Sequence, residues 1–331
     1  ITTMSIIDKP SDYFNTVLWS GDNVDGRAIT TGLETNWTWA KRRNATNGFI
    51  IADSVRGATY KLDSSTTNAE VNNYDGGHLE SFTSTGFTMG VGSGDFGHLN
   101  ASGGTYVAWN WKKTADAGFD IVAYTGNGSN RTISHSCGAV PKMIIIKDRS
   151  AADNWNVYNS SSGNNSHMHL NLTNAASGSS SYWNTTTPTS SVFSLGSNSA
   201  VNANGNNFIA YCFAEKQGYS KFGSYTGNGN ADGTFVYTGF KPAFVMIKRT
   251  DSSNVWVMLD NKRDPFNEVD ANIYANDSQA ELSSDRVDFL SNGFKNIGTG
   301  NANNGSSMQY IYMCFAENPF VSSTGVCATA R

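Results

Sequence analysis

His167 and His169, with Met168 between them, form the pattern in the chain that most clearly suggests metal chemistry. Side chains two residues apart on a β-strand project from the same face, so both imidazoles would point in one direction. Three chains around an axis would then offer six imidazole nitrogens to one metal ion. Ordinary exposed histidines on a polar strand are the alternative. Apart from this metal site on a trimer axis, the sequence indicates no cofactor.

Tyr182, Trp183 and Asn184 form the second candidate site, because they interrupt a polar, Ser-rich stretch. Aromatic faces stack on the apolar C–H patches of sugars, while amides bond to hydroxyl groups. These residues therefore predict a binding surface for a glycan or a protein receptor. In the alternative reading, Trp183 only plugs the end of its own domain.

Motifs typical of enzymes are weak. No G-x-S-x-G elbow occurs, and carboxylates such as Asp260, Asp264 and Glu268 are the nearest approach to a sugar-hydrolysing pair. TGNG, at 125–128 and 226–229, lacks the Lys-Ser/Thr of a phosphate loop and predicts an Asn-Gly hairpin turn. The turns at 22–26 and 228–233 lack the carboxylate density of a calcium loop, so we expect solvated turns. The sequence thus favours a protein that is not an enzyme.

Composition excludes two classes of partner. The net charge is −4 and charged residues make up 15% of the 331 residues, with no basic block, so a nucleic-acid footprint is absent. The longest apolar runs are about seven residues, far below the ~20 of a membrane helix, so we expect no membrane span. The opening residues lack the pattern of a secretory signal. The four cysteines are expected to be free thiols, which indicates assembly in a reducing cytoplasm.

Three copies of one motif organise the chain: TYVAWNWKK, NFIAYCFAEK and QYIYMCFAEN. Their first aromatic residues, Tyr106, Phe208 and Tyr310, are equally spaced by about 100 residues, which indicates a repeated folding unit. Lys41, Lys147 and Lys248 align in the same way. We expect an N-terminal arm or linker at residues 1–12, three repeats at 13–113, 114–217 and 218–318, and a tail at 319–331.

Short runs of β-branched and aromatic residues, joined by Gly- and Asn-rich turns, predict an all-β protein. Each repeat has the strand inventory of a β-sandwich, so we expect three tandem, jelly-roll-like repeats of about 100 residues. The run before each aligned lysine is the most apolar strand, and residues 207–216 are expected to be the closing strand of their repeat. Helical turns are predicted only within 264–280 and near Ser54.

The sequence resembles a repeat domain of unknown function that is common in predicted tail-fibre and other virion proteins of marine bacteriophages. The resemblance rests on DKPSDYFNTVLWSGD, DSVRG at Asp53, LESFTSTGFTMG and YVAWNWK in the first repeat, and on YTGNG, PKMIIIKDR, PAFVMIKRT and the FAE endings in the others. It covers about Asp8 to Phe320. The second repeat lacks DSVRG and carries the Ser-rich insert instead.

The resemblance implies a non-enzymatic virion structural protein, such as a tail fibre, spike or decoration protein. We expect a homo-oligomer, with a trimer favoured, that binds other virion proteins and a host surface glycan or receptor through its loops. It would be assembled in the host cytoplasm and displayed on the virion surface. A glycan depolymerase is one alternative. An extracellular filament is the other, with residues 1–12 pairing against the sheet edge of the next subunit.

Overall fold

The computed structural model describes residues 6–72, 78–90 and 99–329, and its regular structure is almost entirely β. The helical elements there are three short turns: η1 (Pro10–Asp12), α1 (Ser180–Trp183) and α2 (Ser199–Asn202). The helix predicted within 264–280 is wrong, because this stretch contains the strand β22 (Val269–Tyr274). Residues 54–56 form a turn, and β-branched and aromatic side chains occupy most strand positions.

The described residues contain 25 strands, which fall into three groups along the chain. The first group is β1 (Phe14–Ser20), β2 (Arg27–Thr30), β3 (Trp37–Arg42), β4 (Phe49–Asp53), β5 (Gly57–Leu62), β6 (Val71–Asn72), β7 (Leu79–Thr83), β8 (Gly86–Met89) and β9 (Thr105–Trp111). The second is β10 (Phe119–Thr125), β11 (Arg131–Ser134), β12 (Pro141–Asp148), β13 (Asn156–Asn159), β14 (Ser166–His169), β15 (Ser177–Gly178), β16 (Val192–Leu195) and β17 (Asn207–Ala214). The third is β18 (Ser220–Thr226), β19 (Phe235–Tyr237), β20 (Phe240–Arg249), β21 (Trp256–Asp260), β22, β23 (Leu282–Leu290), β24 (Gly293–Asn296) and β25 (Gln309–Pro319).

The three groups, called the first, second and third segments below, build antiparallel sheets with matching strand orders. The long sheets run β1-β9-β3-β4-β5-β6 and β10-β17-β12-β13-β14-β15, and the third begins β18-β25-β20-β21-β22. Small sheets, β2-β8-β7 and β11-β16, accompany the first two, while β23-β24-β19 continues the third long sheet. The last strand of each segment in sequence, β9, β17 or β25, is therefore an interior strand of its long sheet. It lies between the strands that come first and third in the sequence of that segment. Asn207–Ala214, expected to be the closing strand, is the last strand of its segment in sequence but does not lie at the edge of the sheet.

The Asn-Gly turns join strands that do not pair with each other. β10 pairs with β17, whereas β11 pairs with β16, so the turn at Asn127 and Gly128 does not connect paired strands and the predicted hairpin is wrong. Gly128 adopts φ +70, a conformation that glycine tolerates and other residues rarely adopt. The Asn127 side chain accepts a hydrogen bond from the amide of Ser129 at 3.0 Å. This Asx turn carries the chain from the long sheet to the small one.

Each segment folds as a β-sandwich: two sheets pack face to face in the first and second segments, and the two ends of one long sheet do so in the third. In the first segment, Trp19, Tyr106 and Ala108 of the long sheet pack against Ile29 and Phe87 of the small sheet. Separate buried clusters fill the corresponding space in the second and third segments. The sheets bury apolar side chains on these inner faces because the strands alternate their side chains between two sides.

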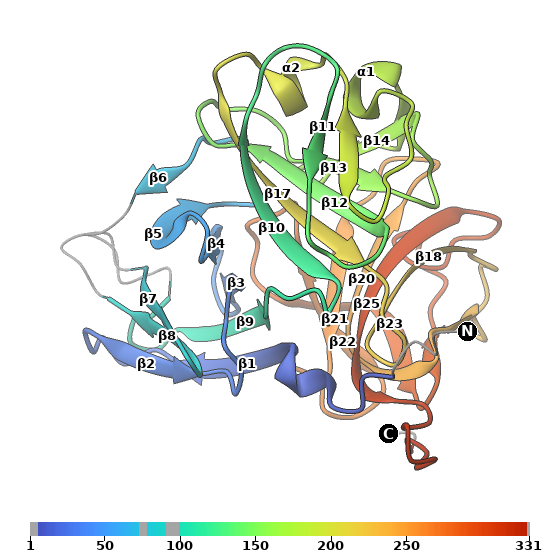
Figure 1. The fold of residues 1–331 in the computed structure, drawn as a ribbon. Helices are drawn as coiled ribbons and strands as arrows, with labels where there is room; N and C mark the ends of the chain where they lie inside the picture. The colour runs from blue at the N-terminus through green and yellow to red at the C-terminus, as the bar shows by residue number, and fades with distance from the viewer. Residues whose placement is uncertain (1–5, 73–77, 91–98, 330–331) are drawn as a thin grey trace.

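The opposite faces of the three long sheets meet in one shared core. Trp111, Phe213 and Phe315, at matching positions of β9, β17 and β25, have ring centroids 5.5 to 6.4 Å apart. Each ring is at most 1% exposed. Figure 1 shows the three segments, in blue to teal, green to yellow, and orange to red, arranged around this common centre. The motif that repeats in the sequence therefore supplies the contact that joins the segments.

Both ends of the described chain lie together (Figure 1). The Ile7 amide donates to the carbonyl of Gln217 at 3.1 Å, and Ile7 packs against the shared core. The Asp8 carboxylate accepts hydrogen bonds from the Ser323 amide, at 2.7 Å, and from the Ser323 hydroxyl. Residues 6–12 therefore contact their own chain.

Candidate functional site

The two sequence-predicted sites lie side by side in the second segment. β14 pairs with β13 on one side and with the short strand β15 on the other, and α1 follows β15 directly. The Ser179 side chain caps α1 by accepting from the Ser181 amide, and Asn184 ends the helix in the left-handed conformation. β14 and α1 thus bring His167 and His169 next to Tyr182.

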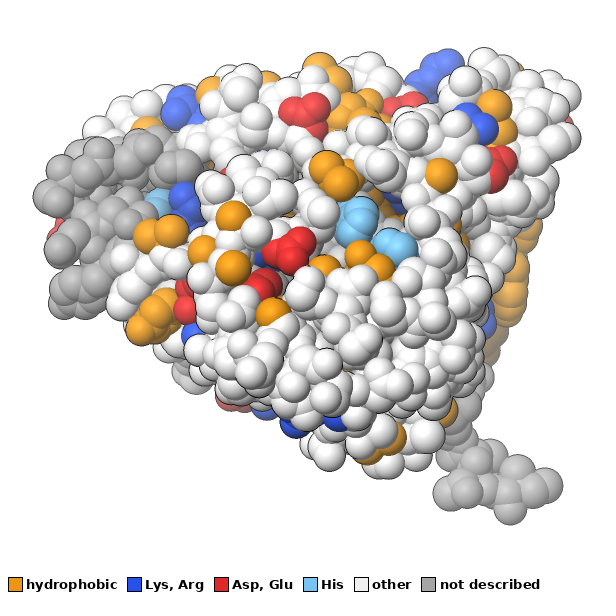
Figure 2. All heavy atoms as spheres, turned by 90° about the horizontal axis from the view of Figure 1, so that it is seen from above, with side chains coloured by type: hydrophobic (Ala, Val, Ile, Leu, Met, Phe, Trp, Pro, Cys, Tyr) orange, Lys and Arg blue, Asp and Glu red, His pale blue; other side chains and the backbone are white. Residues whose placement is uncertain are grey.

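The three rings form a small platform. His167 stacks on Tyr182 with ring centroids 3.7 Å apart and an interplanar angle of 11°, and His169 lies 5.2 Å from His167. Met168 points to the opposite side, into the shared core. Figure 2 shows that the face seen from above carries scattered charges and a neighbouring pair of histidines with hydrophobic side chains beside them. The expected same-face placement of both imidazoles is confirmed.

The platform is electrically neutral near pH 7. Burial, followed by the nearby His169, lowers the pKa of His167 to about 4. Burial also lowers the pKa of His169, although the charge of Asp153 opposes this, and burial raises the pKa of Tyr182. Neutral rings of this kind suit stacking and hydrogen bonding.

Trp183 and Asn184 are not part of the three-ring platform. Trp183 is 2% exposed, packs against Tyr158 and donates from Nε1 to the Ser166 carbonyl at 2.8 Å. The expectation of an exposed ring at this position is therefore wrong, and the alternative of a plug is correct. Asn184 accepts from the side chain of Asn130 at 2.8 Å.

The metal prediction finds no further ligand within one chain. The buried Nδ1 atoms of His167 and His169 have no hydrogen-bond partner. In the described residues, however, no group of three or more His, Cys, Asp or Glu side chains could hold a metal ion. Two imidazoles are fewer than the three or four protein ligands of typical zinc sites. A metal at this platform stays a prediction that requires ligands from other chains.

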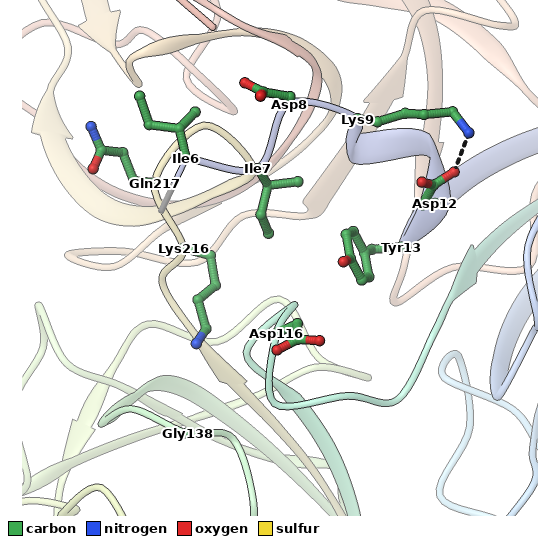
Figure 3. Close-up of a pocket in the computed structure, with 10 residues that line it drawn as sticks. All are labelled: Ile6, Ile7, Asp8, Lys9, Asp12, Tyr13, Asp116, Gly138, Lys216 and Gln217. Carbon is green, nitrogen blue, oxygen red and sulfur yellow. Dashed lines mark hydrogen bonds and ion pairs between the residues drawn. The ribbon is translucent and has the colours of Figure 1, made fainter. Parts of the chain in front are cut away.

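A separate cavity of about 450 Å³ lies where residues 6–13 meet the turns at Asp116 and Lys216. Figure 3 shows the Lys216 ammonium, the Asp116 carboxylate and the Tyr13 ring around it, while Lys9 and Asp12 pair with each other at 2.5 Å. The lining mixes both signs of charge. The arrangement could hold a small polar molecule, but its lining residues include no histidine or cysteine that could act as a nucleophile or a general base at neutral pH.

The remaining motifs serve the fold. Asp22 bonds to the Val24 amide and pairs with Arg27, as a structural turn does. Asp264 accepts from the amides of Asp270 and Ala271. The four cysteines are free, as expected, and Cys327 is the exposed one. Among residues 6–72, 78–90 and 99–329, no helix is long and apolar enough to span a membrane.

Sequence reasoning missed two buried ion networks between neighbouring segments. In the first network, Arg56 forms ion pairs with Asp53 at 2.5 Å and with Glu70 at 3.0 Å. Arg149 of the second segment forms a bidentate ion pair with Glu70. The hydroxyl of Tyr211 donates to Asp53 at 2.8 Å. Although burial opposes its charge, the carboxylate of Asp53 holds the pKa of Arg56 above its ordinary value.

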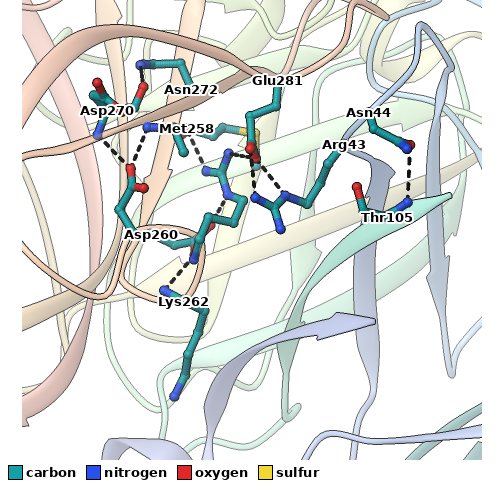
Figure 4. A network of polar contacts seen from close by, with 12 residues as sticks. Arg43, Asn44, Thr105, Met258, Asp260, Lys262, Asp270, Asn272 and Glu281 are labelled. Atoms are coloured by element: carbon teal, nitrogen blue, oxygen red, sulfur yellow. Dashed lines mark hydrogen bonds and ion pairs between the residues drawn. The ribbon is translucent and has the colours of Figure 1, made fainter. Parts of the chain in front are cut away.

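The second network repeats this pattern between the third segment and the first (Figure 4). Arg263 binds Asp260 at 2.6 Å and Glu281 at 3.1 Å, and Arg43 forms a two-pronged bond to Glu281. Trp109 donates from Nε1 to Asp260 at 3.0 Å. The signal in the sequence was the recurrence of Asp-x-x-Arg at 53–56 and 260–263.

Comparison with known proteins gives a family and nothing further. A family model described as "Domain of unknown function (DUF7483)" matches residues 9–319. The match therefore spans all three long sheets. No curated protein and no solved structure matches the chain.

Proposed function

We propose that this chain, which belongs to the DUF7483 family of domains of unknown function, is a non-enzymatic virion structural protein that binds a surface glycan through its second segment. The observation that carries the proposal is the neutral platform of Tyr182, His167 and His169. The resemblance to phage tail-fibre proteins suggests the setting, a fibre, spike or decoration protein on the virion surface.

The platform has the chemistry that a sugar requires. The half-buried Tyr182 ring, which stacks on the largely buried His167, offers an apolar face. The Tyr182 hydroxyl and the half-buried His169 can exchange hydrogen bonds with sugar hydroxyl groups. Weak contacts of this kind gain avidity when many copies act together on one particle. The shared aromatic core supports the platform from below, because Met168, between the two histidines, packs into that core.

We also propose that the three segments are tandem copies of one jelly-roll-like sandwich of about 100 residues, at 13–113, 114–217 and 218–318. The matching strand orders and the positions of Trp111, Phe213 and Phe315 support this division. In this view one chain already has three related lobes around a centre. A trimer of chains is then not needed to produce a threefold arrangement.

Binding to host surface polysaccharide, measured by saturation-transfer NMR, tests the glycan proposal. Tyr182→Ala should abolish the transfer signal, whereas Tyr237→Ala, which alters a tyrosine that is 59% exposed in the third segment, should leave it unchanged. A reducing-end assay on the same mixture separates binding from hydrolysis, since product formation would favour the depolymerase. No binding by the wild-type chain would reject the proposal.

Electron microscopy of the purified chain tests the virion setting against the filament. The filament hypothesis uses residues 1–12 as an arm for the next subunit, but residues 7 and 8 are already bonded to Gln217 and Ser323 of the same chain. We therefore expect discrete particles. Long polymers in the images would favour the filament.

A further inference from the structure

We propose that a second copy of this chain docks on the first, with the loop at residues 264–268 of each copy inserted into the groove between β1 and β2 of the other. The inference names a partner and does not depend on the proposed function. It rests on two complementary surfaces of the same chain, the groove between β1 and β2 and the loop at residues 264–268.

The groove has a volume of about 640 Å³ and lies between two open sheet edges. β1 ends the long sheet, where it pairs with β9, and β2 ends the small sheet, where it pairs with β8. Edge strands present backbone N–H and C=O groups that have no ladder partner. Leu18, on the wall of the groove, is 39% exposed. The groove therefore combines backbone hydrogen-bonding capacity with an apolar contact.

The charge of the groove is positive. Arg27 and Lys262 line it, and its lining residues include no carboxylate. Arg27 pairs with Asp22 at 3.1 Å. Lys262 is exposed, and its side chain points away from the buried network around Asp260 (Figure 4). Within the described part of the chain, its ammonium makes no ion pair or hydrogen bond. A charge left free beside an open groove favours an anionic occupant.

The loop at 264–268 has the complementary properties. Phe266 is 77% exposed, more than any other large hydrophobic residue in the described ranges. Asp264 and Glu268 flank it. Burial, followed by the negative charges of Asp264 and Glu268, raises the pKa of the Asp270 carboxyl nearby. Arg286, which pairs with Glu268 at 2.8 Å, opposes this shift, so three carboxylates and one arginine surround the loop. An exposed aromatic ring between carboxylates matches a positive groove with an apolar wall.

A twofold arrangement uses both surfaces twice. The groove and the loop belong to the same chain, and an isologous dimer pairs surface i with surface j and surface j with surface i. The single interface of this dimer would bury two Phe266 rings and neutralise two Lys262 charges. Closure at two copies follows, because both complementary surfaces are then occupied.

Sedimentation velocity over a concentration series tests the dimer. The wild-type chain should dimerise at micromolar concentration, and Phe266→Ser and Lys262→Glu should each weaken dimerisation at least about tenfold, a change of ~1.4 kcal/mol. Val55→Glu is the matched control, because Val55 has the place in the turn after β4 that Lys262 has after β21, and it lines the corresponding groove beside β10. This control should dimerise like the wild type.

Cysteine trapping identifies the surfaces. In a Cys327→Ser background, which removes the exposed thiol, mixing Leu18→Cys with Phe266→Cys under mild oxidation should give a crosslinked heterodimer. Neither variant alone should crosslink to the same extent. A wild-type chain that stays monomeric at about 100 μM would overturn the proposal. A dimer that resists both Phe266→Ser and Lys262→Glu, or a trimer, would overturn it too.

Discussion

Among the residues that the structure describes, the contact between the second and third segments has no counterpart of the ion network that the other two contacts share. Asn159 stands where the other segments have Asp53 and Asp260, and Ser162 stands where they have Arg56 and Arg263. Ala176 stands where the other contacts have Glu70 and Glu281, and Thr250 stands where they have Arg149 and Arg43. Met313 stands where they have Tyr211 and Trp109. All five positions differ together.

The backbone contacts, in contrast, are the same at all three places. The amides of Glu70, Glu281 and Ala176 donate to the carbonyls of Arg149, Arg43 and Thr250 at 3.0, 2.8 and 2.9 Å. The same backbone bond therefore forms between segments with the ion network and without it. A network of buried charges is present or absent as a whole, because a single buried charge without a partner is strongly destabilising.

Breaking a network should have the largest effect. Arg56→Ala leaves the Asp53 carboxylate, which is 0% exposed, without its guanidinium, and should lower the free energy of unfolding by about 3–5 kcal/mol. Urea denaturation monitored by tryptophan fluorescence measures it. Arg286→Ala, which removes one half of an exposed pair with Glu268, should cost less than ~1 kcal/mol. If Arg56→Ala and Arg286→Ala lower the free energy of unfolding equally, the buried network contributes no more than an exposed ion pair.

Introducing one charge into the contact without a network should come next. Asn159 is 1% exposed and its Nδ2 has no partner, so Asn159→Asp buries a lone carboxylate and should cost about 2–3 kcal/mol at pH 7. Adding Ser162→Arg, Ala176→Glu and Thr250→Arg should recover at least half of the loss in urea denaturation. If the quadruple variant is no more stable than Asn159→Asp alone, the charges do not act as a unit.

Acid should weaken the network around Glu281. Burial opposes the charge of this carboxylate, but Arg43 and Arg263 lower its pKa below the ordinary value. A lowered folded pKa contributes stability that is present above the unfolded pKa of ~4.3 and is lost as pH falls through the folded value. We expect a loss of about 1–2 kcal/mol below pH 4 that Glu281→Gln reduces. An unchanged acid profile in this variant would argue against the assignment.

Alkaline conditions should have the smallest effect for each titrating group, through the three aligned lysines. Burial lowers the pKa of Lys41, Lys147 and Lys248 to about 8 in each case. The unfolded chain then binds more protons between pH 8 and 10, so stability should rise with pH there, on the order of 1 kcal/mol per lysine. Denaturation at both pH values checks this, and Lys147→Met should show a smaller rise. A fall in stability would give the wrong sign.

Local patterns in the sequence predicted much of the fold. The strands before Lys41, Lys147 and Lys248 are interior and largely buried, as their apolar runs indicated. The position of the last strand could not be predicted, because its two partners are distant in sequence and turn signals connect only neighbours. The sheet change at Asn127 was missed for the same reason.

The candidate site was predicted only where period-two spacing decides the outcome. That spacing placed His167 and His169 on one face, but neither the stacking on Tyr182 nor the burial of Trp183 follows from it, since both depend on how α1 packs against β14. The buried carboxylates Asp53 and Asp260 look like ordinary turn residues in the sequence. Their partners Tyr211 and Trp109 lie about 150 residues away or more, as the bonds between them show.

The junction of Asp8 with Ser323 has a consequence for length. Because residues near both ends lie at one place, the polypeptide enters and leaves the three segments, here called the ring of three sheets, at the same point. In a longer protein that carried this ring between two other domains, the ring would project sideways as a lobe and add almost nothing to the end-to-end distance. A pulling force on the flanking domains would then act on the contact between Asp8 and Ser323 before it reached the shared aromatic core.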